Sequence, residues 1–317
     1  MVSICNQISY NKDIKETICN QCCGFVAVRK EFHFIMKIKL IVPVILCLVL
    51  SCGMMMPFLV PDAAAGEGSA EVDSVLLSIN GTRVDFGVPV ILINATTYVP
   101  IYYFSMAMGV DYVTQYDGMA TVSAPGLRIY ANAGDPYLVA NGRYLHVPYL
   151  CREIDGQIYV PIRPLAYAFG AELAWNSYTR TVSVVQLGEP IKHGDYFYCE
   201  TDVFWMSRII SAEARGEPFV GQIAVGNVVM NRVDSYMYPD TIHGVIFDRR
   251  HGIQFTPAHS GAINRTPYRT CIIAAKLALE GANVIGDSLF FSSSRITCWA
   301  SRNRPFNTRI GNHNFFD

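Results

Sequence analysis

A repeated pattern with a shift of 61 positions is the feature that most limits how this chain can fold. Asn80-Gly81 recurs as Asn141-Gly142, and Tyr98-Val99-Pro100-Ile101 recurs as Tyr159-Val160-Pro161-Ile162. Each Asn-Gly pair stands between two short strand-like runs, which predicts a β-hairpin with a tight turn. The recurrence therefore predicts a duplicated β-rich domain over residues 72–186.

Each Tyr-Val-Pro motif leads into a short apolar segment, residues 101–108 in the first copy and residues 162–169 in the second. A glycine follows each segment, Gly109 and Gly170 respectively. Proline near the start and glycine just past the end are typical of a helix. We therefore expect each repeat to contain a hairpin, a short helix and a closing pair of strands.

This duplicated unit resembles the copper amine oxidase N-terminal-like domain, on the strength of its Asn-Gly and Tyr-Val-Pro motifs. The resemblance implies an extracytoplasmic module of Gram-positive bacteria, and it does not imply copper. His146 is the one histidine between residues 72 and 186, and no second ligand stands at a useful spacing. We expect a spacer or a scaffold that contacts the cell wall, with no metal and no cofactor.

The residues before this domain are typical of export. Met36-Lys37-Ile38-Lys39 is basic, residues 40–50 are apolar, and Ala63-Ala64-Ala65 offers a cleavage site. This pattern predicts a signal peptide over residues 36–65, with an uncleaved anchor helix as the alternative. Residues 1–35 show no periodic pattern, and we expect a non-native or disordered extension before a true start at Met36. The chain is then secreted, and it contacts the membrane only through the signal segment.

A carboxylate at the end of an apolar helix marks the second half of the chain. Val203, Met206, Ile210 and Glu213 are spaced by three, four and three residues, so they share one helix face. Burial on such a face disfavours the charged form and raises the pKa of Glu213, which suits a general acid near neutral pH. A purely structural Glu213, paired with an arginine such as Arg215 or Arg232, is the alternative that spacing leaves open.

The helix carrying Glu213 is expected to stop at Gly216, and a new helix is expected to start at Glu217-Pro218. This break means that Glu213 and Glu217 need not face one another. We expect Glu217 to favour the dipole of the next helix rather than to take part in chemistry. The stretch then offers one catalytic carboxylate and not a pair.

Several motifs stand in order over residues 197–317 and resemble the catalytic domain of SleB/CwlJ-type cell wall hydrolases, the spore-cortex-lytic enzymes. They are Glu213-Ala214-Arg215-Gly216-Glu217, Gly221-Gln222-Ile223-Ala224-Val225, Asn231-Arg232-Val233, Gly244-Val245-Ile246, Gln254-Phe255-Thr256-Pro257 and Ile310-Gly311-Asn312-His313-Asn314-Phe315. The resemblance implies a mostly helical, lysozyme-like fold similar to lytic transglycosylases, with Glu213 catalytic. The whole chain is then α+β. The segment Phe290 to Ser294 departs from the clearer aromatic-Asn segment of the family.

These features predict an enzyme that cleaves peptidoglycan glycan strands between N-acetylmuramic acid and N-acetylglucosamine. Glycosidases that use water need two carboxylates, whereas one acid/base suits lytic transglycosylation. Hydrolysis by a muramidase or glucosaminidase is an alternative, with Asp234, Asp240 or Asp248 as helpers. A peptidoglycan-binding protein without activity is another alternative.

A set of polar and aromatic residues is expected to line the substrate groove. These residues are Gln254, Phe255, Trp299, Asn303 and His313. Two interpretations stay open for several of them, because Phe255 and Trp299 could be core residues and His313 could hold the C-terminus through a hydrogen bond.

Charge and motif spacing weigh against other classes of protein. The net charge is −1 and no basic block appears, which argues against nucleic-acid binding. The histidines lack the compact spacing of a zinc peptidase, so we predict no metal. Expected partners are peptidoglycan and, as a candidate, an accessory or inhibitory wall protein of a Gram-positive-type spore former.

Overall fold

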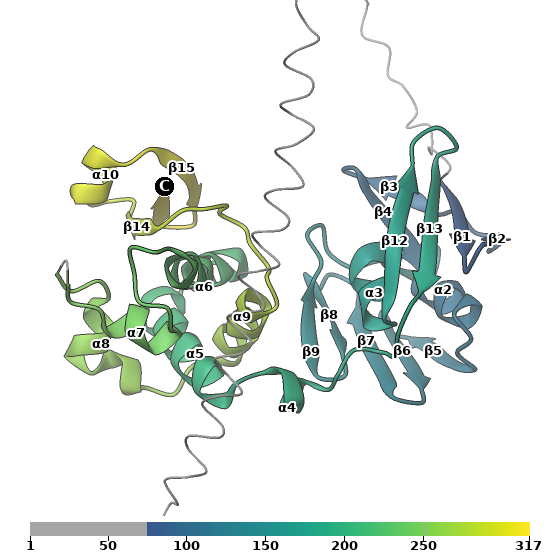
Figure 1. Ribbon diagram of the computed structural model, residues 1–317, viewed down its shortest axis with the longest axis horizontal. Helices are drawn as coiled ribbons and strands as arrows, with labels where there is room; N and C mark the ends of the chain where they lie inside the picture. The colour runs from purple at the N-terminus through teal and green to yellow at the C-terminus, as the bar shows by residue number, and fades with distance from the viewer. Residues whose placement is uncertain (1–74, 251) are drawn as a thin grey trace, which may run out of the picture. The chain divides into compact units, whose positions relative to one another are not determined.

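The computed structural model describes residues 75–250 and 252–317, and these residues belong to one compact unit. The β-rich region comes first and the mostly helical region follows, which confirms the predicted α+β class (Figure 1). The predicted extension over residues 1–35 and the predicted signal peptide over residues 36–65 lie outside the described residues. The domain limits 72–186 and 197–317 stay predictions.

Both Asn-Gly pairs form the tight turns that the sequence predicts. Strands β1 (Leu76–Ile79) and β2 (Thr82–Val84) join at Asn80-Gly81, and β8 (Tyr137–Ala140) and β9 (Arg143–His146) join at Asn141-Gly142. The φ angles are +50° and +81° in the first turn, and +50° and +76° in the second. Asparagine and glycine tolerate positive φ, so the turn residues fix the position of each hairpin.

The two Tyr-Val-Pro strands lie side by side. Strand β4 (Thr96–Pro100) pairs antiparallel with β11 (Gln157–Pro161), and Val99 lies opposite Val160. Helices α2 (Ile101–Ala107) and α3 (Ile162–Ala168) start directly after the prolines, as predicted. Strands β3 (Ile91–Ile93) and β10 (Arg152–Ile154) complete this four-stranded sheet on either side, in the order β10-β11-β4-β3.

The first hairpin of one repeat joins strands of the other repeat. Strand β1 runs parallel to β13 (Thr181–Gln186), which also pairs with β12 (Ala171–Asn176). A five-stranded sheet in the order β5-β6-β7-β8-β9 is built from β5 (Tyr112–Tyr116), β6 (Met119–Ala124), β7 (Leu127–Asn132) and the second hairpin. Strand β7 has no counterpart in the 61-residue pattern.

Three helices form the centre of the second region. They are α5 (Glu200–Ala214), α6 (Phe219–Asp234) and α9 (Arg269–Leu279), and each contacts the other two. A Cβ on Gly226 of α6 would lie 3.0 Å from the Cβ of Ala278 on α9 and 3.1 Å from Cδ1 of Ile210 on α5. The glycine therefore lets the three helices approach closely.

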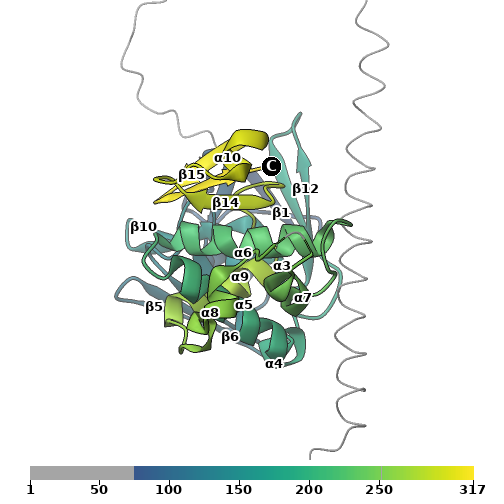
Figure 2. The same ribbon diagram turned by 90° about the vertical axis from the view of Figure 1, so that its left-hand side faces the viewer.

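Shorter helices and a small sheet surround these three helices. The helices are α4 (Gly194–Phe197), α7 (Ile242–Phe247), α8 (Thr256–Ser260), η1 (Ala262–Asn264) and α10 (Trp299–Asn303). Strands β14 (Phe290–Ser293), β15 (Phe306–Ile310) and β16 (His313–Phe316) form a sheet in the order β14-β16-β15, which packs on α6 (Figure 2). Two strands of this sheet, β14 and β15, thus contact the helix that follows Glu217.

Two further findings concern the described residues alone. No helix among them is both long enough and apolar enough to cross a bilayer. Cys151, Cys199, Cys271 and Cys298 are free thiols, so these four cysteines form no disulfide in this part of the chain.

Candidate active site

Glu213 lies at the end of the apolar face of α5. Met206 and Ile210, which precede it on that face, are fully buried, whereas Glu213 itself is only partly buried. Removal from water raises the pKa of the Glu213 carboxyl to about 7, because burial penalises the charged form. The carboxyl therefore holds its proton near neutral pH while keeping some contact with solvent.

Neither arginine of the structural alternative pairs with Glu213. The Arg215 guanidinium lies 5.8 Å from the centre of the Tyr268 ring. Arg232 donates from Nε to the carbonyl oxygen of Leu289 at 2.8 Å. Within the described residues, no hydrogen bond or ion pair reaches the Glu213 carboxyl, and its pKa is raised by burial alone. An unpaired acid of this kind can donate a proton to a bound substrate.

Glu217 is held by the C-terminal hairpin. Its carboxylate accepts hydrogen bonds from the backbone N of Asn312 at 2.8 Å and from Nδ2 of Asn312 at 3.2 Å. Burial raises the pKa of Glu217, but the bonds from Asn312 and the charge of His313 outweigh it and lower the pKa. Glu213 and Glu217 therefore have opposite shifts, so Glu217 is ionised where Glu213 is still protonated. The prediction that Glu217 mainly serves the helix dipole missed this docking role.

Gly311 makes the docking of Glu217 possible. Its φ is +58°, a conformation that side chains rarely adopt. A Cβ at this position would overlap the carboxylate of Glu217 and lie 2.7 Å from Cδ of Pro218. The tight turn between β15 and β16 thus depends on glycine.

We expect Gly311→Ala to lower the free energy of unfolding by about 3 kcal/mol, because backbone strain adds to the overlap with Glu217. Chemical denaturation measures this loss. Gly261→Ala is the matched control, since Gly261 also has positive φ (+81°) but no atom lies within 4 Å of the point that its Cβ would occupy. The control should lose only about 1 kcal/mol. Equal losses in the two variants would contradict the proposed contact.

The structure places Phe255 in the core, which corrects its assignment to the groove. Phe255 is 0% exposed. Its ring lies 6.2 Å from the Phe291 ring and 5.2 Å from the Arg232 guanidinium. Because neighbouring side chains cover the ring completely, it has no surface left for a sugar.

His313 packs against the same aromatic cluster. It is buried, its ring lies 5.2 Å from the Phe291 ring, and its Nδ1 has no hydrogen-bond partner among the described residues. Burial lowers the pKa of His313, and the nearby charge of Glu217 opposes this effect. His313 therefore lies next to the contact between Glu217 and Asn312, since it directly follows Asn312 in the chain.

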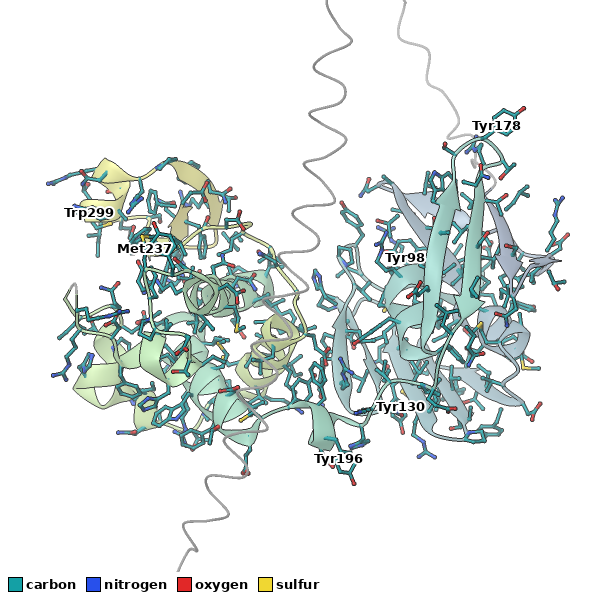
Figure 3. All side chains as sticks on the ribbon, in the orientation of Figure 1. Tyr98, Tyr130, Tyr178, Tyr196, Met237 and Trp299 are labelled. Carbon is teal, nitrogen blue, oxygen red and sulfur yellow. The ribbon has the colours of Figure 1, made fainter. Side chains whose placement is uncertain are left out.

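The other three predicted groove residues are accessible. Trp299 is 59% exposed on α10, and its ring lies 5.8 Å from that of Phe290. Asn303 is exposed and donates from Nδ2 to the carbonyl oxygen of Trp299 at 2.8 Å. Gln254 is half-buried and donates to the carbonyl oxygen of Gly252 at 3.1 Å. Trp299 and Asn303 therefore share one short helix, which Figure 3 shows at the C-terminal sheet.

The proposed aspartate helpers differ in environment. Asp234 and Asp240 are exposed, whereas Asp248 is buried and accepts a bond from Nε of Arg250 at 3.0 Å. Within the described ranges, no three His, Cys, Asp or Glu side chains are grouped as metal ligands. A hollow of about 520 Å³ lies beside the first half of α5, and Glu213 is not among its lining residues.

Comparison with known proteins identifies both regions. Residues 216–316 match the Cell Wall Hydrolase family, and residues 78–184 match the Copper amine oxidase N-terminal domain. Both predicted resemblances are confirmed. The match to the hydrolase family begins at Gly216, three positions after Glu213.

Curated relatives match a little over a third of the chain. The spore cortex-lytic enzyme of Halalkalibacterium halodurans is 38% identical over 119 residues, which cover 37% of this chain and 35% of that protein. The spore cortex-lytic enzyme of Bacillus cereus is 37% identical over 119 residues, covering 37% of this chain and 45% of that protein. The chain thus spans less than half the length of these relatives. The crystal structure of the catalytic domain of the Bacillus cereus SleB protein is 36% identical, with a TM-score of 0.35, and covers 38% of this chain and 92% of that domain.

Proposed function

We propose that the cell wall hydrolase domain of this chain cleaves peptidoglycan glycan strands between N-acetylmuramic acid and N-acetylglucosamine, with Glu213 as the acid. The observation that carries this proposal is the environment of Glu213. Its pKa is about 7, burial is the cause, and no described residue pairs with the carboxyl. The names of the relatives, spore cortex-lytic enzymes, support a cell-wall substrate.

The geometry favours lytic transglycosylation over hydrolysis. Protonated Glu213 donates its proton to the glycosidic oxygen as the bond to C1 of the muramic acid breaks. The resulting carboxylate then takes the proton of the muramoyl 6-hydroxyl, whose oxygen bonds to C1 and closes a 1,6-anhydro ring. One group serves as acid and then as base, so the reaction needs neither a second carboxylate nor water.

Two of the carboxylates considered, Glu217 and Asp248, are engaged in other contacts. Glu217 accepts two bonds from Asn312, and Asp248 is paired with Arg250. A hydrolytic muramidase or glucosaminidase is the second choice, because it would need one of the exposed candidates, Asp234 or Asp240, to activate water. A binding protein without activity gives no reason for an unpaired carboxyl that holds its proton near neutral pH.

The cellular setting follows from the same proposal. We infer action outside the cytoplasm, on the cell wall or spore cortex of a Gram-positive-type spore former. The signal peptide over residues 36–65 and an accessory or inhibitory wall protein stay predictions. The β-rich region is proposed as a contact with the wall rather than as a second enzyme.

Incubating the purified protein with insoluble peptidoglycan tests the proposed cleavage. We expect soluble glycan fragments to appear and the turbidity of the suspension to fall. A loss of peptide cross-links without any change in glycan length would instead indicate a peptidase. If the peptidoglycan stays intact over a range of pH, the proposed enzymatic function is wrong.

Trp299 offers a test of the groove. We expect Trp299→Ala to raise KM for glycan about fivefold with little change in kcat, because an exposed aromatic ring contributes about 1 kcal/mol by stacking on a sugar face. Kinetics on soluble glycan fragments measure the effect. Tyr178→Ala, at a 97% exposed tyrosine of the β-rich region, is the control and should leave both constants unchanged. An unaltered KM in Trp299→Ala would remove this residue from the groove.

A further inference from the structure

The outward face of the five-stranded sheet carries a concentration of exposed tyrosines. Strand β7 alternates buried and exposed residues along its whole length, so one face packs on the core and the other meets solvent. Tyr112 and Tyr116 on β5 and Tyr130 on β7 are 61%, 84% and 38% exposed. Figure 3 shows the Tyr130 side chain on this sheet. A folded domain rarely leaves several large rings exposed on one face without a use.

Strand pairing places these rings among hydroxyl groups. Thr114 lies opposite Thr121, and Thr121 lies opposite Tyr130 on its other side. Residues directly opposite one another in a sheet project from the same face. The outward residues of β5, β6 and β7 are Tyr112, Thr114, Tyr116, Met119, Thr121, Ser123, Arg128, Tyr130 and Asn132. Arg128 is the one charged residue of this group.

The face of the sheet that carries Tyr130 extends across β8 and β9 to a contact with the hydrolase domain. Tyr130 lies opposite Val139, and Val139 lies opposite Tyr144. The Tyr144 ring lies 5.3 Å from the Tyr137 ring, which lies 6.2 Å from the ring of Phe219. Phe219 is the first residue of α6, two positions after Glu217. The exposed face of β5 to β7 therefore borders the contact between the sheet and the start of α6.

We propose that this outward face, defined by Tyr112, Thr114, Tyr116, Thr121 and Tyr130, binds the uncharged backbone of a peptidoglycan glycan strand. Each sugar ring has an apolar C–H face that stacks on an aromatic ring, while its hydroxyl and N-acetyl groups bond to threonine and tyrosine hydroxyls. Tyr112 and Tyr116 are four residues apart on β5, which at about 3.4 Å per residue is about 14 Å along the strand, enough for more than one sugar ring. The assignment rests on the proposed function, since it gives the same substrate a second contact.

The chemistry of the face argues against other partners. A nucleic acid or an anionic membrane surface would require a cluster of Lys and Arg, and the outward residues of β5 to β7 include a single arginine. An obligate protein interface would have a largely apolar centre, whereas threonine and serine lie between the tyrosines here. A neutral ligand rich in hydroxyl groups fits this surface best.

The test measures binding to insoluble peptidoglycan in a Glu213→Gln background, so that the substrate stays uncut. The variant Tyr112→Ser/Tyr116→Ser/Tyr130→Ser should need at least about tenfold more peptidoglycan for half-saturation. Tyr178→Ser/Tyr196→Ser removes two other tyrosines, 97% and 86% exposed, and should bind as the parent does. Thermal unfolding of all variants checks that the fold is intact. β-1,4-linked N-acetylglucosamine hexamers should release the parent protein from peptidoglycan.

These binding results test the glycan site on the sheet independently of cleavage at Glu213. Unchanged binding by the triple variant, or no release by the hexamers, would overturn the glycan assignment even if the native protein cleaves peptidoglycan. Loss of a dimer in the triple variant, seen by light scattering, would show that a second copy of the chain occupies the face. If the native protein does not cleave peptidoglycan but the triple variant binds it more weakly, the proposed cleavage is wrong while the sheet assignment holds.

Discussion

Glu213→Gln should reduce cleavage of peptidoglycan by about a thousandfold, because an amide cannot donate a proton to the glycosidic oxygen. Glutamine has nearly the size and shape of glutamic acid, and no described residue bonds to the Glu213 carboxyl, so the fold should persist. Release of soluble fragments measures the loss. Glu217→Gln is the informative comparison, since it removes a carboxylate of the same motif that bonds to Asn312. It should weaken the hairpin contact yet retain measurable activity.

The same substitution should raise stability at alkaline pH. The pKa of Glu213 is raised from 4.5 to about 7 in the folded protein, so the folded state binds the proton more tightly than the unfolded state does. The stability that this proton provides is fully present below pH 4.5 and is lost as the pH rises through 7. Above that pH the buried charge costs about 3 kcal/mol at most, since partial exposure reduces the penalty.

Two measurements over a range of pH follow from the raised pKa of Glu213 in the folded protein. Activity should fall about tenfold per pH unit above about 7, as free Glu213 loses its proton. The melting temperature of Glu213→Gln should exceed that of the native protein at pH 8.5 and approach it at pH 5. A Gln variant that still cleaves, or that gains no stability at pH 8.5, would contradict the assigned environment of Glu213.

Glu280→Gln should lower the free energy of unfolding by about 3 to 5 kcal/mol, because it leaves the buried charge of Arg143 without its partner. Arg143 on β9 donates to Glu280, just past α9, from Nε at 2.8 Å and from an Nη at 2.6 Å. Each side chain is only 4% exposed. The guanidinium also lies 3.4 Å from the centre of the Phe197 ring and donates to the Tyr167 hydroxyl.

The contact matters because its members come from both regions of the chain. Tyr198, between α4 and α5, donates from its hydroxyl to Glu280 and accepts a bond from the backbone N of Tyr144. Urea denaturation should therefore show the β-rich and helical regions becoming less stable together in Glu280→Gln.

A double variant controls for the loss of the buried charge. Arg143→Met/Glu280→Leu replaces the ion pair by apolar side chains and should recover most of the loss, since it leaves no unpaired charge. If Glu280→Gln unfolds within about 1 kcal/mol of the native protein, the pair contributes little to joining the two regions.

Local sequence patterns predicted the elements that local chemistry controls. Asn-Gly specifies a turn through its own backbone preference, and Pro and Gly bound α2 and α3, so these elements lie within a residue or two of their predicted ends. The face of α5 that carries Glu213 followed from spacing alone. Strand β7 was not predicted from the repeat, because the 61-residue pattern contains no second copy of it.

Contacts between distant residues could not be predicted in this way. Glu217 and Asn312 are 95 positions apart, and Arg143 and Glu280 are 137 positions apart. An aromatic residue after Gln254 suits a groove or a core equally well in sequence. Phe291 on β14 and Arg232 on α6, which contact the Phe255 ring, come from elements that only the fold brings together, so its burial could not be foreseen.

The mass of the cleavage products formed in ¹⁸O-labelled water tests the central claim most directly. Transglycosylation by Glu213 alone predicts 1,6-anhydro ends, lighter than hydrolytic ends by one water and free of ¹⁸O. Reducing ends that carry one ¹⁸O would show that water attacks and that a second group assists Glu213, which would contradict the single-carboxylate mechanism.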